Sequence, residues 1–355
     1  MNLFARSRRG SRTSRRLLTM FLLLWACGPV HALTWTENTA SPGSTKNWRS
    51  IASSSDGTKL AAIVDNGNIW TSTDSGATWT ENTASPGSTK EWASITSSSD
   101  GTKLAAVTHV TNAGGKIWTS TDSGATWTQT SAPNFQWSSI TSSSDGTKLA
   151  AVPVNGYIHT STDSGATWTQ HTSTGFIGVW TSITSSSDGT KLAAVASLGT
   201  SGTGNGNIWT STNSGATWTE NTSTGSGKHW SSITSSSVGT KLAAVVYNGN
   251  IWTSADSGAT WTENTSTGSG KEWNSITSSS DGTKLAASIW SGNIWTSTDS
   301  GATWTEDTSV GSTKGWRSIT SSSEFTKLAA VVGNMVGNIW RAQPTPPPWL
   351  QQQKL

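Results

Sequence analysis

The sequence predicts an all-β fold, a seven-bladed β-propeller whose blades are four-stranded antiparallel sheets, and three observations support this prediction. The residues at 72–79, STDSGATW, occur six times in all with small changes, at a period of roughly 45 residues. Twenty of the 23 tryptophans fall into three repeating columns. A half repeat stands at each end of the array. Units that repeat at this length bury a shared core by stacking on one another.

Each repeat is expected to form a meander of four strands. In the first repeat, residues 48–54 and 59–64 are two strands around a tight turn with the sequence DG. Residues 69–73 and 78–82 are two more strands, after turns at Asn66-Gly67 and at the DSG of the repeated motif.

The first strand of each repeat begins at a tryptophan. Trp48 and Ile51 are three residues apart, which predicts that they point to opposite faces of a blade and that both faces are buried between neighbouring blades. Counting these tryptophans gives seven repeats: Trp48, Trp92, Trp137, Trp180, Trp230, Trp273 and Trp316.

The seventh repeat lacks its fourth strand. Residues 33–38, LTWTEN, match the fourth-strand sequence TWTEN at 78–82, but no motif precedes them. We therefore expect this N-terminal strand to complete the seventh blade and close the ring, which removes free strand edges. An open solenoid of stacked hairpins is the alternative, but it needs capping repeats and does not explain the two half repeats.

Residues 1–32 are expected to be a secretory signal peptide. Six arginines lie within the first 16 residues, an apolar run follows over 17–27, and Val30-His31-Ala32 suits cleavage. The run is too short to span a membrane. Two alternatives stay open, twin-arginine export through Arg15-Arg16 and a lipid anchor at Cys27 within a poor lipobox, LWAC. The protein is therefore expected to be secreted or otherwise extracytoplasmic, in the periplasm, at the cell surface or in a lumen.

The chain after residue 32 is acidic overall. The whole sequence has 23 basic and 20 acidic residues, and removing the six N-terminal arginines leaves 17 basic residues, a net charge of about −3. Nucleic-acid binding is therefore not expected. Cys27 is the single cysteine, so the mature chain has no disulfide. The expected domains are the propeller at 33–342 and a Pro-rich disordered tail at 343–355, and a monomer without a transmembrane span is expected.

The motif S-x-D-x-G-x-x-W resembles the Asp-box, or BNR repeat, of propellers in sialidases, sortilin-type receptors, some glucanases and the photosystem II stability/assembly factor-like family. This resemblance implies a propeller fold. It is closest to the assembly factor-like family, whose propellers are exported and not hydrolytic. The resemblance alone does not identify a ligand.

The acids of this motif look like a row of catalytic carboxylates, but we expect them to be structural. An aspartate at this place accepts backbone N–H bonds within its own turn, and the following glycine permits positive φ. An asparagine in the fourth motif would cap the turn equally well, although it could not act as an acid. The structural role is assigned to Asp74, Asp122, Asp163, Asn213, Asp256 and Asp299.

An enzymatic function is the alternative that the resemblance raises. A sialidase-like glycoside hydrolase would need an arginine cluster, a tyrosine nucleophile with an acidic partner, and a carboxylic acid. The mature chain offers Arg49, Arg317, Arg341, Tyr157 and Tyr247, with Arg49 and Arg317 at one repeating position in blades 1 and 7. No residue-by-residue match to a sialidase motif exists, and no catalytic residue is assigned.

A glucanase-like hydrolase would need two carboxylates across a cleft. Asp65 and Asp307 stand outside the repeat, but nothing in the sequence places them together. The histidines lie in different repeats without metal-ligand spacing, so neither a metal nor a cofactor is expected.

Variation among the repeats predicts a binding surface. The loops between second and third strands and those between blades vary, and both sets emerge on the same face of a four-stranded meander. Tyr247 and Trp290 share one loop position with Asp65 on this face, and Phe135 and Phe176 lie in loops between blades. Neutral drift in these loops is the alternative.

A ring of lysines is expected at the same face. A lysine stands two residues before the first-strand tryptophan in five blades, with few acids beside it, which predicts a positive potential that attracts an acidic ligand. The five are Lys46, Lys90, Lys228, Lys271 and Lys314. The sequence thus favours a non-enzymatic binding module or scaffold for a glycan or protein ligand.

Overall fold

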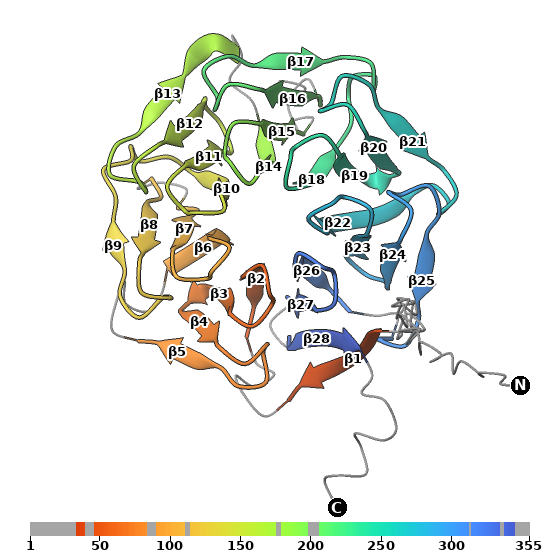
Figure 1. Ribbon diagram of the computed structural model, residues 1–355, viewed down its shortest axis with the longest axis horizontal. Coiled ribbons are helices and arrows are strands. Elements are labelled where there is room, and N and C mark those ends of the chain that lie inside the picture. Colours follow the sequence, from red (N-terminus) through yellow and green to blue (C-terminus); the bar gives the residue numbers. More distant parts are fainter. Residues whose placement is uncertain are drawn as a thin grey trace, which may run out of the picture. The chain divides into compact units, whose positions relative to one another are not determined.

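Seven four-stranded blades surround one axis, as the sequence predicts (Figure 1). The computed structural model describes residues 33–39, 46–83, 90–110, 114–174, 179–197, 206–311, 314–333 and 337–344. Residues from Leu33 onward form one compact unit. The expected signal peptide at 1–32 and residues 345–355 of the expected tail lie outside the described residues.

Within each blade the strands are ordered from the axis outward, and each is antiparallel to its neighbour. Blade 1 consists of β2 (Trp48–Ser53), β3 (Leu60–Gly67), β4 (Ile69–Ser72) and β5 (Thr80–Asn82). Blade 2 consists of β6 (Lys90–Ser97), β7 (Leu104–Thr108), β8 (Ile117–Ser120) and β9 (Thr128–Gln129). Blade 3 consists of β10 (Trp137–Ser142), β11 (Leu149–Pro153), β12 (Ile158–Ser161) and β13 (Thr169–His171), followed by the short 3-10 helix η1 (Thr172–Thr174).

The remaining blades repeat this order. Blade 4 consists of β14 (Trp180–Ser185), β15 (Leu192–Ala196), β16 (Ile208–Ser211) and β17 (Thr219–Asn221). Blade 5 consists of β18 (Trp230–Ser235), β19 (Leu242–Gly249), β20 (Ile251–Ser254) and β21 (Thr262–Asn264). Blade 6 consists of β22 (Lys271–Ser278), β23 (Leu285–Ile289), β24 (Ile294–Ser297) and β25 (Thr305–Asp307). Blade 7 consists of β26 (Trp316–Ser321), β27 (Leu328–Val332), β28 (Ile339–Pro344) and the N-terminal β1 (Leu33–Asn38). Among the described residues, no helix is long and apolar enough to cross a membrane.

Every first strand contains a β-bulge directly after its tryptophan. In β2, Trp48 pairs with Val64 and Ile51 pairs with Ala62, so three steps on one strand match two on the other. Val64 and Ala62 lie on one face of β3, and Trp48 and Ile51 therefore share a face as well. The prediction that Trp48 and Ile51 point to opposite faces is wrong, because strict alternation does not survive a bulge.

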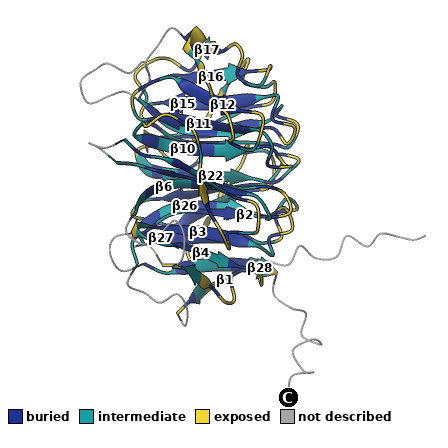
Figure 2. Cartoon of the chain, turned by 90° about the vertical axis from the view of Figure 1, so that its left-hand side faces the viewer, coloured by how far each residue is buried: buried dark blue, intermediate teal, exposed yellow. Residues whose placement is uncertain are grey.

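The core nevertheless covers both faces of each blade, as predicted. Trp48 and Val64 of blade 1 pack with Val331 of blade 7, whereas Ile63 on the other face packs with Trp92 of blade 2. Seven such clusters, one for each pair of neighbouring blades, make up the core. The seven first-strand tryptophans are at most 1% exposed, and Figure 2 shows the buried residues on the inner strands and exposed residues on edge strands such as β17.

Two closed belts of hydrogen bonds join the seven blades. After each first strand, one serine donates its N–H to the carbonyl of the equivalent serine in the next blade at 2.7–2.8 Å. Within each first strand, an isoleucine N–H donates to a serine Oγ of the preceding blade at 3.2–3.4 Å. Both belts return to their starting blade, which requires a closed ring. The first belt contains Ser55, Ser99, Ser144, Ser187, Ser237, Ser280 and Ser323.

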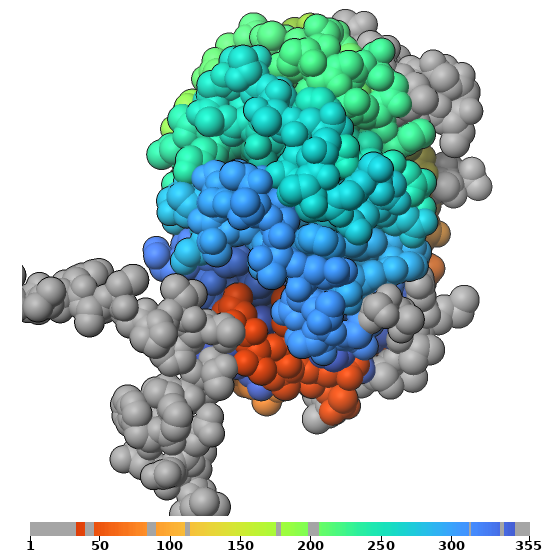
Figure 3. All heavy atoms as spheres, turned by 90° about the vertical axis from the view of Figure 1, so that its right-hand side faces the viewer, coloured from red at the N-terminus to blue at the C-terminus, as the bar shows by residue number. Residues whose placement is uncertain are grey.

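The strand β1 completes blade 7, which confirms the predicted closure. It pairs antiparallel with β28 along its whole length, from Leu33 opposite Pro344 to Asn38 opposite Ile339. Figures 1 and 3 show the N-terminal strand, in red, beside the blue C-terminal blade. The strand β28 continues two residues past the propeller boundary expected at 342, because β1 supplies a partner for these residues.

Side chains of β1 also contact blades 7 and 1. The Asn38 amide donates to the Gly76 carbonyl of blade 1 at 2.8 Å. The Trp35 ring lies 6.2 Å from the Trp316 ring, and Trp35 is half-buried. The closure therefore rests on backbone pairing and the Asn38 contact as well as on burial of Trp35.

Candidate functional site

Three positions in each blade differ from blade to blade at one end of the ring, and we call this surface the variable rim. The first position precedes the first-strand tryptophan: Asn47, Glu91, Gln136, Val179, His229, Glu272 and Gly315. The second is the bulge residue: Arg49, Ala93, Ser138, Thr181, Ser231, Asn274 and Arg317. The third follows the core of the second strand: Asp65, His109, Val154, Ser197, Tyr247, Trp290 and Gly333. The next two residues after each bulge are serine and isoleucine in all seven blades.

The three positions meet because first strands begin, and second strands end, at this end of the ring. Backbone N–H groups of Asp65 and Tyr247 donate to the residues before the first-strand tryptophans of their own blades, each at 2.8 Å. Asp65 also pairs with Glu91 of blade 2, and Tyr247 with Glu272 of blade 6. The predicted turn at Asn66-Gly67 does reverse the chain between β3 and β4, since Ile63 pairs with Ile69, and Asn66 has a φ of 55°.

Bulge residues are structural in four blades. Ser138, Thr181, Ser231 and Asn274 each donate a side-chain hydrogen bond of 2.7–2.9 Å to the carbonyl of the first-strand tryptophan in the next blade. Blades 7 and 1 have an arginine at this position. The repeat therefore changes from a neutral donor to a cation at two neighbouring places on the variable rim.

Arg317 stacks on Trp290 of the neighbouring blade. Its guanidinium carbon lies 3.8 Å from the centroid of the Trp290 ring. Its Nε–H is buried and has no hydrogen-bond partner among the described residues. A buried donor without a partner carries a free-energy cost.

The electrostatic surroundings of Arg317 include one like charge and one opposite charge. The pKa of Arg317 is lowered to about 10. Burial is the main cause, the positive charge of Arg49 acts in the same direction, and the negative charge of Asp65 opposes both. Arg317 stays protonated at neutral pH. The Asp65 carboxylate accepts a 3.2 Å hydrogen bond from Asn47.

Polar pairs between blades continue along the rim. Gln136 and His109 lie 2.7 Å apart, and Ser197 and His229 lie 3.2 Å apart, in each case through side-chain polar atoms. These groups can donate or accept hydrogen bonds according to the imidazole tautomer. The rim thus combines cations, a flat aromatic ring and adaptable polar groups.

Tyr247 belongs to the same rim. Its hydroxyl donates to Glu272 at 3.0 Å, and 38% of the residue is exposed. The hydrogen bond to Glu272 is the main cause that raises the pKa of Tyr247.

The five predicted lysines have indole partners. Each ammonium nitrogen lies 4.5–5.0 Å from the ring centroid of the third-strand tryptophan in its own blade, which is a favourable cation–π distance. Third strands lie farther from the axis than first strands (Figure 1). The structure therefore places these ammonium groups over the blades, each against an aromatic ring that the sequence analysis did not assign to it. Their role in ligand binding stays a prediction. The pairs are Lys46–Trp70, Lys90–Trp118, Lys228–Trp252, Lys271–Trp295 and Lys314–Trp340.

Blade 3 replaces both members of this pair. Phe135 stands at the lysine position and His159 at the tryptophan position, with ring centroids 5.1 Å apart. Phe135 also packs edge-on against Trp137. Phe135 thus supports the packing of blade 3, and Phe176, the other predicted aromatic contact, lies outside the described residues.

The acids of the S-x-D-x-G-x-x-W motif are held within their own turns. Asp74 accepts hydrogen bonds from the Ser72 hydroxyl, the Thr78 N–H and the Thr78 hydroxyl at 2.9, 2.8 and 2.6 Å. The Trp79 indole donates to Gly76 at 3.1 Å. The same geometry recurs at Asp122, Asp163, Asp256 and Asp299, and Asn213 reproduces it with its amide.

These hydrogen bonds keep the turn acids ionised. Hydrogen bonds from Thr167 and Ser161 lower the pKa of Asp163 to about 2, and the hairpin acid Asp56 is lowered to about 2 by Ser54 and Thr58. A general acid at neutral pH needs a raised pKa instead.

We expect the fold to lose stability in acid. A carboxylate whose pKa is lowered in the folded state stabilises the fold at any pH above the ordinary carboxyl value of about 4, and this stabilisation disappears as the pH falls from about 4 toward 2. The melting temperature should therefore be nearly constant from pH 7 to 5 and drop steeply below pH 4. A flat profile down to pH 2.5 would contradict this account of the turn acids.

Arg317, Trp290, Arg49 and Asp65 together form what we call the Arg317 cluster. Several other polar residues considered from the sequence lie away from it. Asp307 ends β25, the outermost strand of blade 6, and accepts hydrogen bonds from Ser309. Arg341 lies on β28 beside blade 1 and lines a different crevice. The described residues contain no group of three or more histidine, cysteine or acidic side chains that could hold a metal ion.

The end of the ring opposite the variable rim has a repetitive surface. A cavity of about 190 Å³ there is lined by serines from all seven blades. Because the same serines recur in each blade, this cavity follows from the repeat and carries no blade-specific chemistry.

Sequence reasoning missed the contact between Arg317 and Trp290. The shared position of Arg49 and Arg317 was visible in the repeat, and Trp290 was visible as a tryptophan outside the three columns. The contact itself joins the hairpin of one blade to the bulge of the next, and the spacing of the repeat does not show it.

These features define a class of protein, a closed seven-bladed β-propeller with blade-specific polar and aromatic residues on one rim. No protein-family model matches the sequence, and no curated protein matches it either.

Solved structures with this fold are similar. YCF48 from Cyanidioschyzon merolae has 16% identity and a TM-score of 0.65, over 87% of this chain and 98% of that one. YCF48 bound to D1 peptide has 18% identity and a TM-score of 0.65, over 88% and 97%. The GH74 xyloglucanase from Xanthomonas campestris has 14% identity and a TM-score of 0.65, over 85% of this chain but 52% of the enzyme. At these identities the likeness shows the fold alone.

Proposed function

We propose that this protein is an exported, non-enzymatic binding module that holds an acidic segment of a protein partner on its variable rim. The observation that supports this most strongly is the Arg317 cluster. Two cations replace structural hydroxyl and amide donors, one of them stacks on Trp290, and its buried Nε–H has no partner among the described residues. A carboxylate would supply the opposite charge to both guanidinium groups.

A peptide fits this rim better than a rigid small molecule. The polar pairs and aromatic groups extend over several blades, so an extended chain can contact more than one of them. One similar structure is YCF48 with a D1 peptide bound, which illustrates that a ring of this fold can hold a peptide. A role in photosystem II assembly is the finer form of this proposal, and neighbouring genes for photosynthesis would support it.

Binding should depend on Arg49 and Arg317. We expect the double change Arg49→Ser and Arg317→Ser to weaken binding to an acidic ten-residue peptide by roughly 10- to 100-fold, because two charge-assisted interactions are lost. Serine is the native residue at this position in blades 3 and 5, so the change keeps the repeat pattern. Titrations against peptide and glycan arrays at low and high salt provide the measurement.

The matched control is Lys284→Gln. It removes one positive charge whose ammonium donates to the Glu324 carbonyl of the next blade, away from the variable rim. The control should bind as the parent does. Equal affinities of the unsubstituted protein and the double arginine variant for the peptide would contradict the proposal. Preferential binding to anionic glycans would show that the ligand is a glycan and not a peptide.

A glycoside hydrolase that acts on an acidic sugar is the second candidate. The hydrogen bond from Tyr247 to Glu272 favours it, because a carboxylate beside a phenol can act as the base that activates a nucleophile. Arg317 and Arg49 would then bind the sugar carboxylate. Hydrolysis of a fluorogenic glycoside of an acidic sugar by the unsubstituted protein, with loss of this activity in Tyr247→Phe, would establish this function. An unsubstituted protein that has no such activity and binds the peptide supports the binding module.

A further inference from the structure

Gly333 is the only residue without a side chain at the third position of the variable rim, where the other six blades each have a side chain. Gly333 is buried, and its N–H donates to the Gly315 carbonyl at 2.9 Å. Asp65 and Tyr247 make the same backbone contact in their own blades. Gly333 therefore follows the repeat in its backbone and differs from it only in the missing side chain.

The backbone conformation of Gly333 does not require a glycine. Glycines with a φ in the left-handed region occur in the turns of the repeat, as at Gly57 and Gly76, but the φ of Gly333 lies outside that region. An alanine could adopt the same backbone conformation without strain. What the glycine provides at this place is space.

The Arg317 side chain occupies that space. A Cβ at position 333 would lie 2.6 Å from Cγ and 2.8 Å from Nε of Arg317. Non-bonded carbon atoms are most stable at about 3.5 to 4.0 Å, so Arg317 would have to move. The same Cβ would lie 3.2 Å from the Trp48 carbonyl oxygen. Because this backbone atom belongs to the core of blade 1, an alanine could not relieve the clash by moving toward that blade.

Arg317 is thus held between two blades. Its stem lies against Gly333 of its own blade, and its guanidinium carbon lies 3.8 Å from the centroid of the Trp290 ring in blade 6. Trp290 and Gly333 occupy the same rim position in neighbouring blades. The largest side chain at this position and the absent one therefore fix the same arginine.

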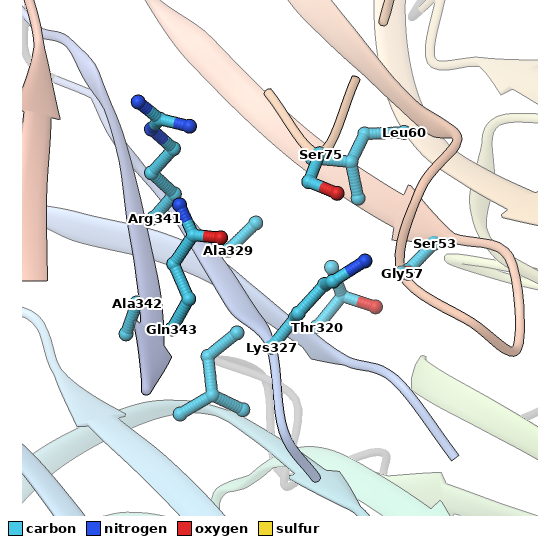
Figure 4. A pocket seen from close by; sticks show the side chains of 11 residues that line it. Ser53, Gly57, Leu60, Ser75, Thr320, Lys327, Ala329, Arg341, Ala342 and Gln343 are labelled. Atoms are coloured by element: carbon cyan, nitrogen blue, oxygen red, sulfur yellow. The ribbon is translucent and has the colours of Figure 1, made fainter. Parts of the chain in front are cut away.

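The other two arginines after residue 32 lack this arrangement. Arg49 has Asp65 at the third rim position of its own blade, so a Cβ is present where blade 7 has none. Arg341 lies on β28, and the residues that line its crevice include no aromatic side chain (Figure 4). The pairing of a ring with a glycine is specific to Arg317.

We propose that Gly333 is a positioning residue of the binding site, which holds the Arg317 guanidinium against Trp290 and so presents a preorganised cation to a partner carboxylate. This inference rests on the proposed function, because it concerns the same arginine. A guanidinium that is fixed before binding loses less conformational entropy when the carboxylate arrives. A side chain at position 333 therefore weakens binding, although Gly333 itself need not contact the ligand.

The test is a double-mutant cycle of Gly333→Ala and Arg317→Ser, read out as binding of the acidic peptide. Gly333→Ala alone should weaken the peptide roughly 10-fold. When Arg317→Ser is already present, the same change should alter binding by less than about 2-fold. The matched control is Arg341→Ser, which removes a positive charge away from the variable rim and should bind as the unsubstituted protein does.

Crystal structures of the unsubstituted protein and of Gly333→Ala, both without peptide, give a readout that does not depend on the ligand. The Arg317 guanidinium should leave the Trp290 ring in the variant. If Gly333→Ala does not fold, restoration of folding by Arg317→Ser supports the clash, and unfolding that persists overturns it.

Two further results would overturn the proposal. One is an Arg317 guanidinium that still stacks on Trp290 in Gly333→Ala, and the other is an equal loss of peptide binding with and without Arg317. Unchanged binding in the double arginine variant would contradict the proposed function instead, and the two crystal structures would still decide whether Gly333 positions Arg317.

Discussion

Removing β1 is expected to destabilise the protein by roughly 3 to 5 kcal/mol, because the change removes a six-residue backbone ladder and uncovers Trp316 and Ala342. It also deletes the Asn38 contact to Gly76 of blade 1. The outer edge of β28 would then be unpaired, which favours association between molecules. Thermal and chemical unfolding of a chain that begins at Thr39 provide the measurement.

The control is a chain that begins at Leu33, which keeps the whole of β1. It should unfold as the longer chain does. A second control ends at Pro344 and keeps the whole of β28. If the chain from Thr39 and the chain from Leu33 unfolded at the same temperature, β1 would not be the strand that closes the ring.

Substitutions of two tryptophans are expected to distinguish a residue needed for stability from one needed for binding. Trp230 is 1% exposed and its indole donates to the Gly206 carbonyl at 2.7 Å, so Trp230→Ala should cost about 3 to 5 kcal/mol of stability. Trp290 is half-buried on the variable rim beneath Arg317. Trp290→Ala should therefore change the free energy of unfolding by less than about 1 kcal/mol. The same change should weaken the binding of an acidic peptide roughly 10-fold.

Unfolding curves and peptide titrations on the same two variants give the comparison. Phe at position 290 should restore most of the binding, because a ring face is what Arg317 contacts. If Trp290→Ala instead lost much stability while its folded fraction bound the peptide with unchanged affinity, Trp290 would be a core residue and not part of the binding site.

The repeat explains why so much of the fold could be predicted. A motif with a fixed period determines one blade, and seven copies with a half repeat at each end determine the number of blades and their closure. The bulge after Trp48 could not be predicted, because the pattern of apolar residues is compatible with a regular strand and the extra residue appears only in the register with β3.

The candidate site was predictable only in part, because it depends on contacts between blades. The varying loops indicated the correct class of surface, but the position of each side chain depends on the neighbouring blade. Arg317 illustrates this, since its partner Trp290 belongs to blade 6. Lys46 was misplaced for a different reason: its ammonium group lies over Trp70 on the third strand of its own blade, a contact that the spacing along the sequence does not show.

The most direct test of the account is a crystal structure of the protein with the tightest-binding acidic peptide from the array. We predict that a peptide carboxylate binds to the guanidinium groups of Arg317 and Arg49, with the rest of the peptide along the variable rim. A peptide bound instead at the serine-lined end of the ring, or along an outer strand such as β1, with no carboxylate at Arg317 or Arg49, would contradict the account.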